Sequence, residues 1–204
     1  FDTIVYTRST PRTRDVFRIK DEINLPKGKP NIDTILYYEM TPQNLQTRLL
    51  EDSVRITGDL HVFVLYVPVD EERRMEYLET ECSIDSLVSC SGCNEQMIPD
   101  ISFQPQCGTM EAKPDEDGEQ RILELELPVN ITVKFYEDVE LSILSDAYST
   151  ACELTLSRQP VHFERLLLKT QNVIRVSEQI KADENQDKIL QICTASGRVK
   201  SKSR

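Results

Sequence analysis

The sequence of 204 residues contains no tryptophan, only two histidines and only six glycines. Tryptophan is the side chain with the largest aromatic contact surface, so its absence disfavours a module that stacks sugar rings. The low glycine content and the ten prolines are not those of a low-complexity or disordered chain. The sequence also lacks any run of about 18 apolar residues, so it predicts no membrane-spanning helix.

Positive charge is scarce as well. The chain has 24 lysines and arginines against 35 aspartates and glutamates, which gives a formal net charge of −11. Such a chain repels phosphates and anionic lipid headgroups, so we expect neither nucleic acid nor a membrane as a partner. A length of 204 residues suits one domain with a hydrophobic core plus additional material.

The clearest pattern is an alternation over residues 121–136, RILELELPVNITVKFY. Every second residue is apolar and the residues between are mostly polar, which is the period of a strand with one buried face. Pro128 lies on the outward face and cannot donate a ladder hydrogen bond, so we expect an edge position or a bulge there. The residues predicted to face the core together are Leu123, Leu125, Leu127, Val129, Ile131, Val133 and Phe135.

Three further strands are predicted upstream. Alternation over residues 54–66 indicates a second long strand, in which Gly58 marks a bulge. Residues 75–88 and 98–107 indicate two shorter strands, and residues 113–119 (KPDEDGE) an acidic turn that leads into the long strand. These elements predict a mainly β fold of two packed sheets, similar to a β-sandwich.

One short helix is expected within this fold. Pro26, Gly28 and Pro30 break the chain, and Asn31 then offers an N-cap. The apolar residues that follow are spaced as on one face of a helix over residues 31–40.

The chain then repeats part of itself. Residues 173–180 (VIRVSEQI) align with residues 16–23 (VFRIKDEI), and residues 187–190 (DKIL) align with residues 33–36 (DTIL). This self-similarity predicts the start of a second repeat, made of a strand and a helix. The predicted organisation is an N-terminal arm over residues 1–14, a β domain over 15–168, and a partial second repeat with a basic tail over 169–204.

Cys90 and Cys93 have the CxxC spacing of half a zinc site or of a redox pair. A structural zinc site needs two more ligands, and only Cys107 is near in sequence. A redox pair needs its first cysteine at the start of a helix, whereas this region indicates a loop between strands. We therefore predict no metal site and interpret both residues as thiols of an exposed loop, which in an oxidising environment would form disulfides between subunits.

Two other groups of polar residues also have simpler explanations. The carboxylates around Gly118 could bind calcium, but they lack the ligand order of a calcium loop and stand where Asp117-Gly118 is expected to form a turn. His61 and His162 are each isolated in the sequence from a carboxylate and a nucleophile that could complete a catalytic group. We therefore expect neither an enzyme nor a bound cofactor.

Four stretches taken together resemble the SPOCS domain, which occurs in coat and exosporium assembly proteins of endospore-forming bacteria. They are KPNID at residues 29–33, VRITG at 54–58, VKFY at 133–136 and SDAYS at 145–149. The resemblance implies a non-enzymatic structural protein of the spore envelope, in the coat, the exosporium or a surface appendage. It also implies assembly from the mother-cell cytoplasm, with copies of the chain itself and other spore-envelope proteins as partners.

The two ends of the chain suggest how such assembly would occur. Residues 1–6 form a short apolar strand without a hairpin mate nearby, and residues 198–204 are basic. Strands added to the sheet edge of a neighbour would give a ring or, if the rotation does not close, a filament of identical subunits, held through terminal segments and sheet edges. The alternative is a β-sandwich module that binds a ligand or carbohydrate. The residues predicted to take part in assembly are Ile4, Val5, Tyr6, Arg8, Arg12, Arg14, Lys200, Lys202 and Arg204.

Overall fold

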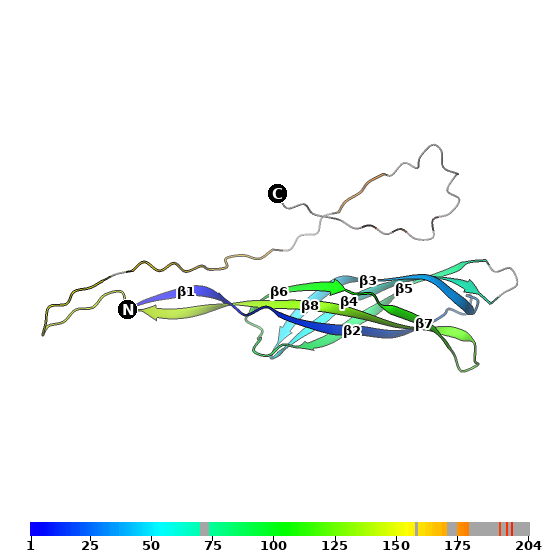
Figure 1. Ribbon diagram of the computed structural model, residues 1–204, viewed down its shortest axis with the longest axis horizontal. Helices are drawn as coiled ribbons and strands as arrows, with labels where there is room; N and C mark the ends of the chain where they lie inside the picture. Colours follow the sequence, from blue (N-terminus) through cyan, green and yellow to red (C-terminus); the bar gives the residue numbers. More distant parts are fainter. Residues whose placement is uncertain are drawn as a thin grey trace. The chain divides into compact units, whose positions relative to one another are not determined.

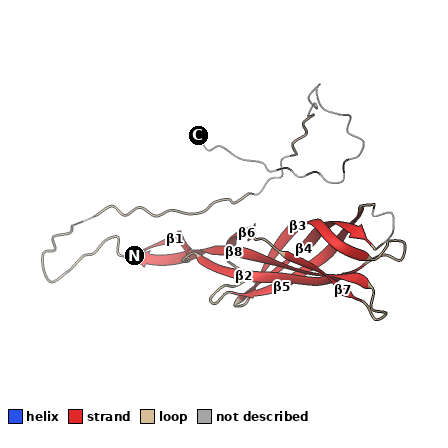
Figure 2. Ribbon diagram, turned by 45° about the vertical axis from the view of Figure 1, so that its right-hand side comes forward, coloured by secondary structure: helices blue, strands red, loops and turns tan. Residues whose placement is uncertain are grey.

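The computed structural model describes residues 1–69, 74–157, 159–170, 175–179, 192, 195 and 197. The chain divides into two units, Phe1–Leu168 and Lys169–Arg204, and every strand found among the described residues lies in the first. The described residues form strands in two sheets and contain no helix (Figure 2), so the predicted mainly β fold of two sheets is confirmed. This part of the chain accordingly has no helix able to cross a membrane.

The strands follow one another along the first unit. They are β1 (Asp2–Ser9), β2 (Thr13–Asn24), β3 (Ile32–Leu50), β4 (Ser53–Pro68), β5 (Glu76–Ser89), β6 (Ile98–Pro105), β7 (Thr109–Pro114) and β8 (Gln120–Ile143).

The long strand β8 organises the larger sheet, because all four other strands of that sheet are hydrogen-bonded to it (Figure 1). β1 and β2 follow one another along β8, with Ser9 opposite Tyr136 and Thr13 opposite Val133. Between these pairs, the backbone N–H of Thr10 donates to the carbonyl of Phe135 at 2.9 Å. β6 and β7 also pair with β8, one after the other.

Pro128 lies in this central strand and not at an edge, so the predicted edge position is wrong. The predicted irregularity is present, but it lies in the partner strands. β6 ends with Pro105 opposite Val129, and β7 begins with Thr109 opposite Glu126, so the ladder is interrupted beside Pro128. The interruption removes the need for the N–H that proline lacks.

The smaller sheet has the order β3-β4-β5. Its register shifts between the pairs Gln43/Asp59 and Gln46/Thr57, which leaves an extra residue of β3 opposite Gly58. A Cβ atom at Gly58 would lie 2.8 Å from the carbonyl oxygen of Gln43. The bulge predicted at Gly58 is therefore confirmed, although β3 supplies the extra residue.

Residues 32–40 belong to β3, so the helix predicted over residues 31–40 is wrong. Ile32 begins the strand and is 1% exposed. The register shifts between Ile32 and Thr34 and again between Ile35 and Tyr37, and each shift reverses which residues face the core. Two shifts within six residues replace the alternation of a regular strand with a spacing that imitates a helix. The helix predicted for the second repeat lies outside the described residues. Of the strand predicted over residues 173–180, residues 175–179 are described and form no strand.

The core lies between the two sheets and draws on both. β8 contributes its seven odd-numbered residues from Leu123 to Phe135, and each of them is at most 4% exposed. The predicted core face is therefore confirmed. From the smaller sheet, β4 contributes Val54, Ile56, Leu60, Val62, Val64 and Tyr66 to the same cluster. β8 of the larger sheet and β4 of the smaller sheet, each with buried side chains at alternate positions, thus pack face to face, as in a sandwich.

Candidate functional site

β1 and the end of β8 form a two-stranded ribbon, in which residues 2–9 pair with residues 136–143. The pairing of β6 with β8 extends only to Tyr136, which lies opposite Ile98, and among the described strands β1 contacts only β8. As predicted, the N-terminal strand has no hairpin mate nearby in the sequence, but it does have a partner within its own chain. The partner lies at the far end of the domain sequence, where a search for a neighbouring hairpin mate could not find it.

The ribbon has one apolar face. On that face Ile4 lies opposite Leu141, and Tyr6 lies opposite Val139. These four side chains are half-buried or exposed, with Leu141 at 38%. A two-stranded ribbon is marginally stable by itself, so an apolar face of this kind favours further packing. Val5, by contrast, points to the opposite face and lies beside Glu140.

A segment from the end of the first unit contacts the outer edge of β1. The backbone N–H of Thr7 donates to the carbonyl of Glu164 at 2.9 Å, and the N–H of Leu166 donates to the Thr7 hydroxyl at 2.8 Å. At the residue before Thr7 in β1, the ring of Tyr6 lies 5.4 Å from the ring of Phe163. The ribbon therefore already binds one extended segment through its backbone edge and its apolar face.

Asp138 of the ribbon also binds the segment around residues 163–166, through an ion pair with Arg165. Its carboxylate accepts hydrogen bonds from the Thr7 hydroxyl at 2.8 Å and from Arg165 at 2.9 Å. The Thr7 bond and then the Arg165 contact hold the pKa of Asp138 below its usual range.

Three of the six predicted basic assembly residues lie in the described part of the chain. The guanidinium of Arg8 lies 2.7 Å from the carboxylate of Glu137 across the ribbon, so Arg8 already has an ionic partner within the chain. Arg12 and Arg14 are exposed. Lys200, Lys202 and Arg204 lie outside the described residues.

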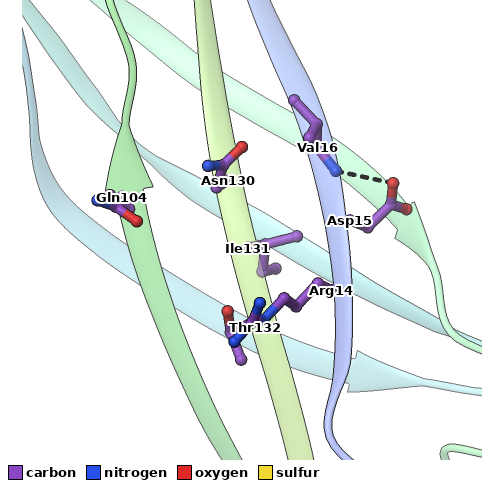
Figure 3. Close-up of a pocket in the computed structure, with 7 residues that line it drawn as sticks. All are labelled: Arg14, Asp15, Val16, Gln104, Asn130, Ile131 and Thr132. Carbon is purple, nitrogen blue, oxygen red and sulfur yellow. Dashed lines mark hydrogen bonds between the residues drawn. The ribbon is translucent and has the colours of Figure 1, made fainter.

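Arg14 borders a shallow depression on the larger sheet, whose other lining residues include Gln104, Asn130 and Thr132. Figure 3 shows these polar side chains on three neighbouring strands, β2, β8 and β6. The hydrogen bond drawn there runs from the N–H of Val16 to the Asp15 carboxylate and is local to β2. In the described part of the chain, no three His, Cys, Asp or Glu side chains are grouped closely enough to hold a metal ion.

The Cys90-Cys93 turn is fastened to the β3–β4 turn through Asp52. The N–H of Cys90 donates to the carbonyl of Asp52 at 2.8 Å, and the N–H of Gly92 donates to its carboxylate at 2.6 Å. Cys93 is 1% exposed, with its Sγ 3.4 Å from the carbonyls of Leu50 and Ser53, so the prediction that it lies in an exposed loop is wrong. Cys90 is half-buried.

Burial also makes these thiols harder to ionise. It is the main cause that raises the pKa of both Cys90 and Cys93. Burial and the neighbouring Asp21 carboxylate raise the pKa of Cys82 to about 11. All five cysteines in the described residues are free thiols within the chain. The disulfides predicted between subunits stay a prediction.

Two further sites have clear roles in the structure. The Asp115 carboxylate accepts from the N–H groups of Asp117 and Glu119, both at 3.0 Å, and Gly118 has φ of 83°. The turn interpretation of the acidic stretch is therefore confirmed. His61 does have a carboxylate beside it, since its Nε2 lies 2.8 Å from Glu79 across β4 and β5. Only the strand pairing reveals this contact.

A known family matches part of this architecture. Residues 31–106 match the family model described as SipL, SPOCS domain. In the structure this span contains the whole smaller sheet, β3 to β5, together with β6. Neither a curated protein nor a solved structure matches the chain. The resemblance found in the sequence is confirmed over residues 31–106: the chain carries a SPOCS domain match, which indicates a sporulation-related protein.

Proposed function

We propose that this chain is a non-enzymatic structural protein of the bacterial endospore envelope, in the coat, the exosporium or a surface appendage. It assembles by association with itself, and with other envelope proteins, through terminal segments and sheet edges. The SPOCS match supports the connection to sporulation. The observation that carries the assembly role is the two-stranded ribbon of β1 and β8.

The ribbon offers two means of association. Its apolar face, with Ile4, Tyr6, Val139 and Leu141, remains partly open to solvent. In addition, residues 137–143 of β8 pair with β1 alone among the described strands, so one of their edges has no strand beside it. Backbone groups on such an edge can pair with a strand of another chain without a special side-chain site.

The expected assembly is a ring or a filament. A ribbon of one copy that binds a different surface of the next makes a heterologous contact, which closes into a ring or continues as a helical filament. Such a protein would act at the spore surface, after release from the mother-cell cytoplasm where it is made.

The test is the mass of the full chain in solution as a function of concentration, by light scattering, together with electron microscopy. A variant that lacks residues 1–9 removes β1 and leaves β2, which starts at Thr13, in place. We expect the full chain to form large assemblies and this variant to remain monomeric.

Substitutions on the two faces of the ribbon provide a matched pair. Leu141→Ser, on the apolar face, should reduce assembly, whereas Thr3→Ala, on the other face, should leave it unchanged. A full chain that stays monomeric at every concentration would disprove the proposed function.

A ligand-binding β-sandwich remains the second candidate, because the depression beside Arg14 presents several polar side chains on one sheet face. Thr132→Tyr would fill this depression. The assembly proposal predicts that this variant forms normal particles and keeps its role in the envelope. The binding alternative predicts that the variant loses ligand binding, although its assembly is unaffected.

A further inference from the structure

The outer face of the smaller sheet carries three aromatic rings in a row, one from each strand. Phe63 of β4 lies between Tyr37 of β3 and Tyr77 of β5, at centroid distances of 6.3 and 5.9 Å. The two tyrosines cover Phe63, which is only 4% exposed although it does not belong to the core between the sheets. Tyr37 and Tyr77 are themselves 43% and 42% exposed. The result is an aromatic strip that faces solvent.

Acidic residues surround this strip. The sheet alternation and the contacts between side chains place six carboxylates on or beside this face but, among the described residues, only three permanent cations, Lys29, Arg48 and Arg55. The face is therefore acidic, as well as aromatic, and suits a cationic partner. The six carboxylates belong to Glu39, Asp59, Glu76, Glu79, Glu81 and Asp85.

The chain itself shows how this face holds a lysine. The ammonium of Lys29 lies 5.1 Å from the centre of the Tyr77 ring and 2.8 Å from the carboxylate of Glu76. A ring face and a carboxylate together stabilise an ammonium by cation–π and ionic attraction. Tyr37 and Glu39 repeat this combination at the other end of the strip, where the hydroxyl lies 3.3 Å from the carboxylate.

The spacing of these groups matches a segment in the same sequence. Glu79 and Glu81 are two residues apart on one strand, so their side chains project from the same face about 7 Å apart. Residues 198–204, RVKSKSR, carry a cation at every second position. In an extended strand these cations would project to one side with the same repeat.

We propose that the outer face of the β3-β4-β5 sheet binds the basic segment 198–204 of a second copy, with one cation on the ring of Tyr37 and others on Glu79 and Glu81. This inference rests on the proposed self-association. It assigns that association a surface separate from the ribbon.

The test is binding of a fluorescent peptide, SGRVKSKSR, from residues 196–204. The receptor is the full chain with Arg198, Lys200, Lys202 and Arg204 changed to glutamine, so that its own segments do not compete. We expect saturable binding that weakens about tenfold for Glu79→Gln with Glu81→Gln, because two ion pairs are lost. Tyr37→Leu, which keeps an apolar side chain but removes the π face, should also weaken it.

Two controls separate this surface from general attraction between opposite charges. Glu22→Gln with Glu124→Gln removes the same charge from the larger sheet and should leave binding unchanged. A peptide of the same composition with its cations adjacent, SGVSSRKKR, should bind more weakly than the alternating one. Equal binding of both peptides, or equal loss in both double variants, would overturn the proposal.

The same variants are then measured for assembly by light scattering. If the peptide binds and assembly of the unmodified chain weakens with Glu79→Gln and Glu81→Gln, the proposal holds. If the chain assembles but the peptide does not bind, this surface is wrong and the proposed function stands. If the peptide binds to a chain that stays monomeric, a second copy is not the occupant and the proposed function fails as well.

Discussion

The ring of Phe163 lies 5.4 Å from the ring of Tyr6 and fixes a late segment of the first unit to its first strand. Aromatic pairs of this kind contribute about 0.5 to 1.5 kcal/mol. In Phe163→Ala we expect the Thr7 amide, which donates to Glu164, to exchange with solvent roughly two to ten times faster. Leu167→Ala, at a side chain that is 86% exposed, is the control and should change nothing.

Ile131 and Thr132 are neighbours on β8 with opposite orientations. Ile131 is fully buried in the core, whereas Thr132 points outward. Ile131→Ala should lower the free energy of unfolding by about 2 to 5 kcal/mol, because it leaves a cavity. Thr132→Ala should lower it by less than about 1 kcal/mol. Urea denaturation measures both, and equal small losses would contradict the assigned faces.

Gly58 is required by the close approach of β3. An added Cβ would lie 2.8 Å from the Gln43 carbonyl oxygen and 3.2 Å from the Leu45 Cα, both backbone atoms that cannot easily move. We expect Gly58→Ala to destabilise the fold by about 1 to 3 kcal/mol through overpacking. Gly28 has no atom within 4 Å of such a Cβ, so Gly28→Ala is the matched control and should be nearly neutral.

Arg121 holds the connection between β2 and β3. Its guanidinium donates to the carbonyls of Pro26 and Lys29 at 2.9 and 3.0 Å and to the Asn31 side chain at 2.6 Å. Arg121→Met keeps the length of the side chain but leaves these acceptors without a donor, at a cost of about 1 to 3 kcal/mol. Thermal unfolding should show the loss for Arg121→Met and little change for Arg14→Met, whose side chain is exposed.

The thiols should react in an order set by their surroundings. At pH 8 we expect iodoacetamide to modify the exposed Cys107 and Cys152 well before Cys82 and Cys93. The pKa of about 11 at Cys82 means that its labelling rate should continue to rise with pH up to about that value. Mass spectrometry of partly labelled protein gives the order, and in denaturant the differences should disappear. Labelling of Cys93 as fast as Cys107 in the folded protein would show that the turn opens freely.

The sequence predicted those parts of the fold in which local periodicity and tertiary burial agree. Residues 123–135 alternate without interruption, and each odd position is buried. Residues 31–40 have the apolar spacing of a helix, although residues 32–40 form a strand, because two bulges shift the register of that strand. A bulge depends on the partner strand, which the local sequence does not reveal. The site was harder to predict. Its contacts join residues on different strands, as in the pairing of Tyr6 with Val139 and the ring contact of Tyr77 with Phe63. No local pattern in the sequence indicates such contacts.

The central place of β8 has a consequence for how the chain reaches its fold. β3, β4 and β5 follow one another in sequence and pair with their immediate neighbours, so the smaller sheet can form as soon as those residues have been synthesised. β1 and β2 leave the ribosome before β3 to β8, yet their partner β8 begins only at Gln120. Until then their backbone groups have no ladder, and closing such distant pairs is slow because loop entropy must be overcome first. The larger sheet is therefore completed last, and the strands that form the ribbon remain open to the wrong partner for the longest time.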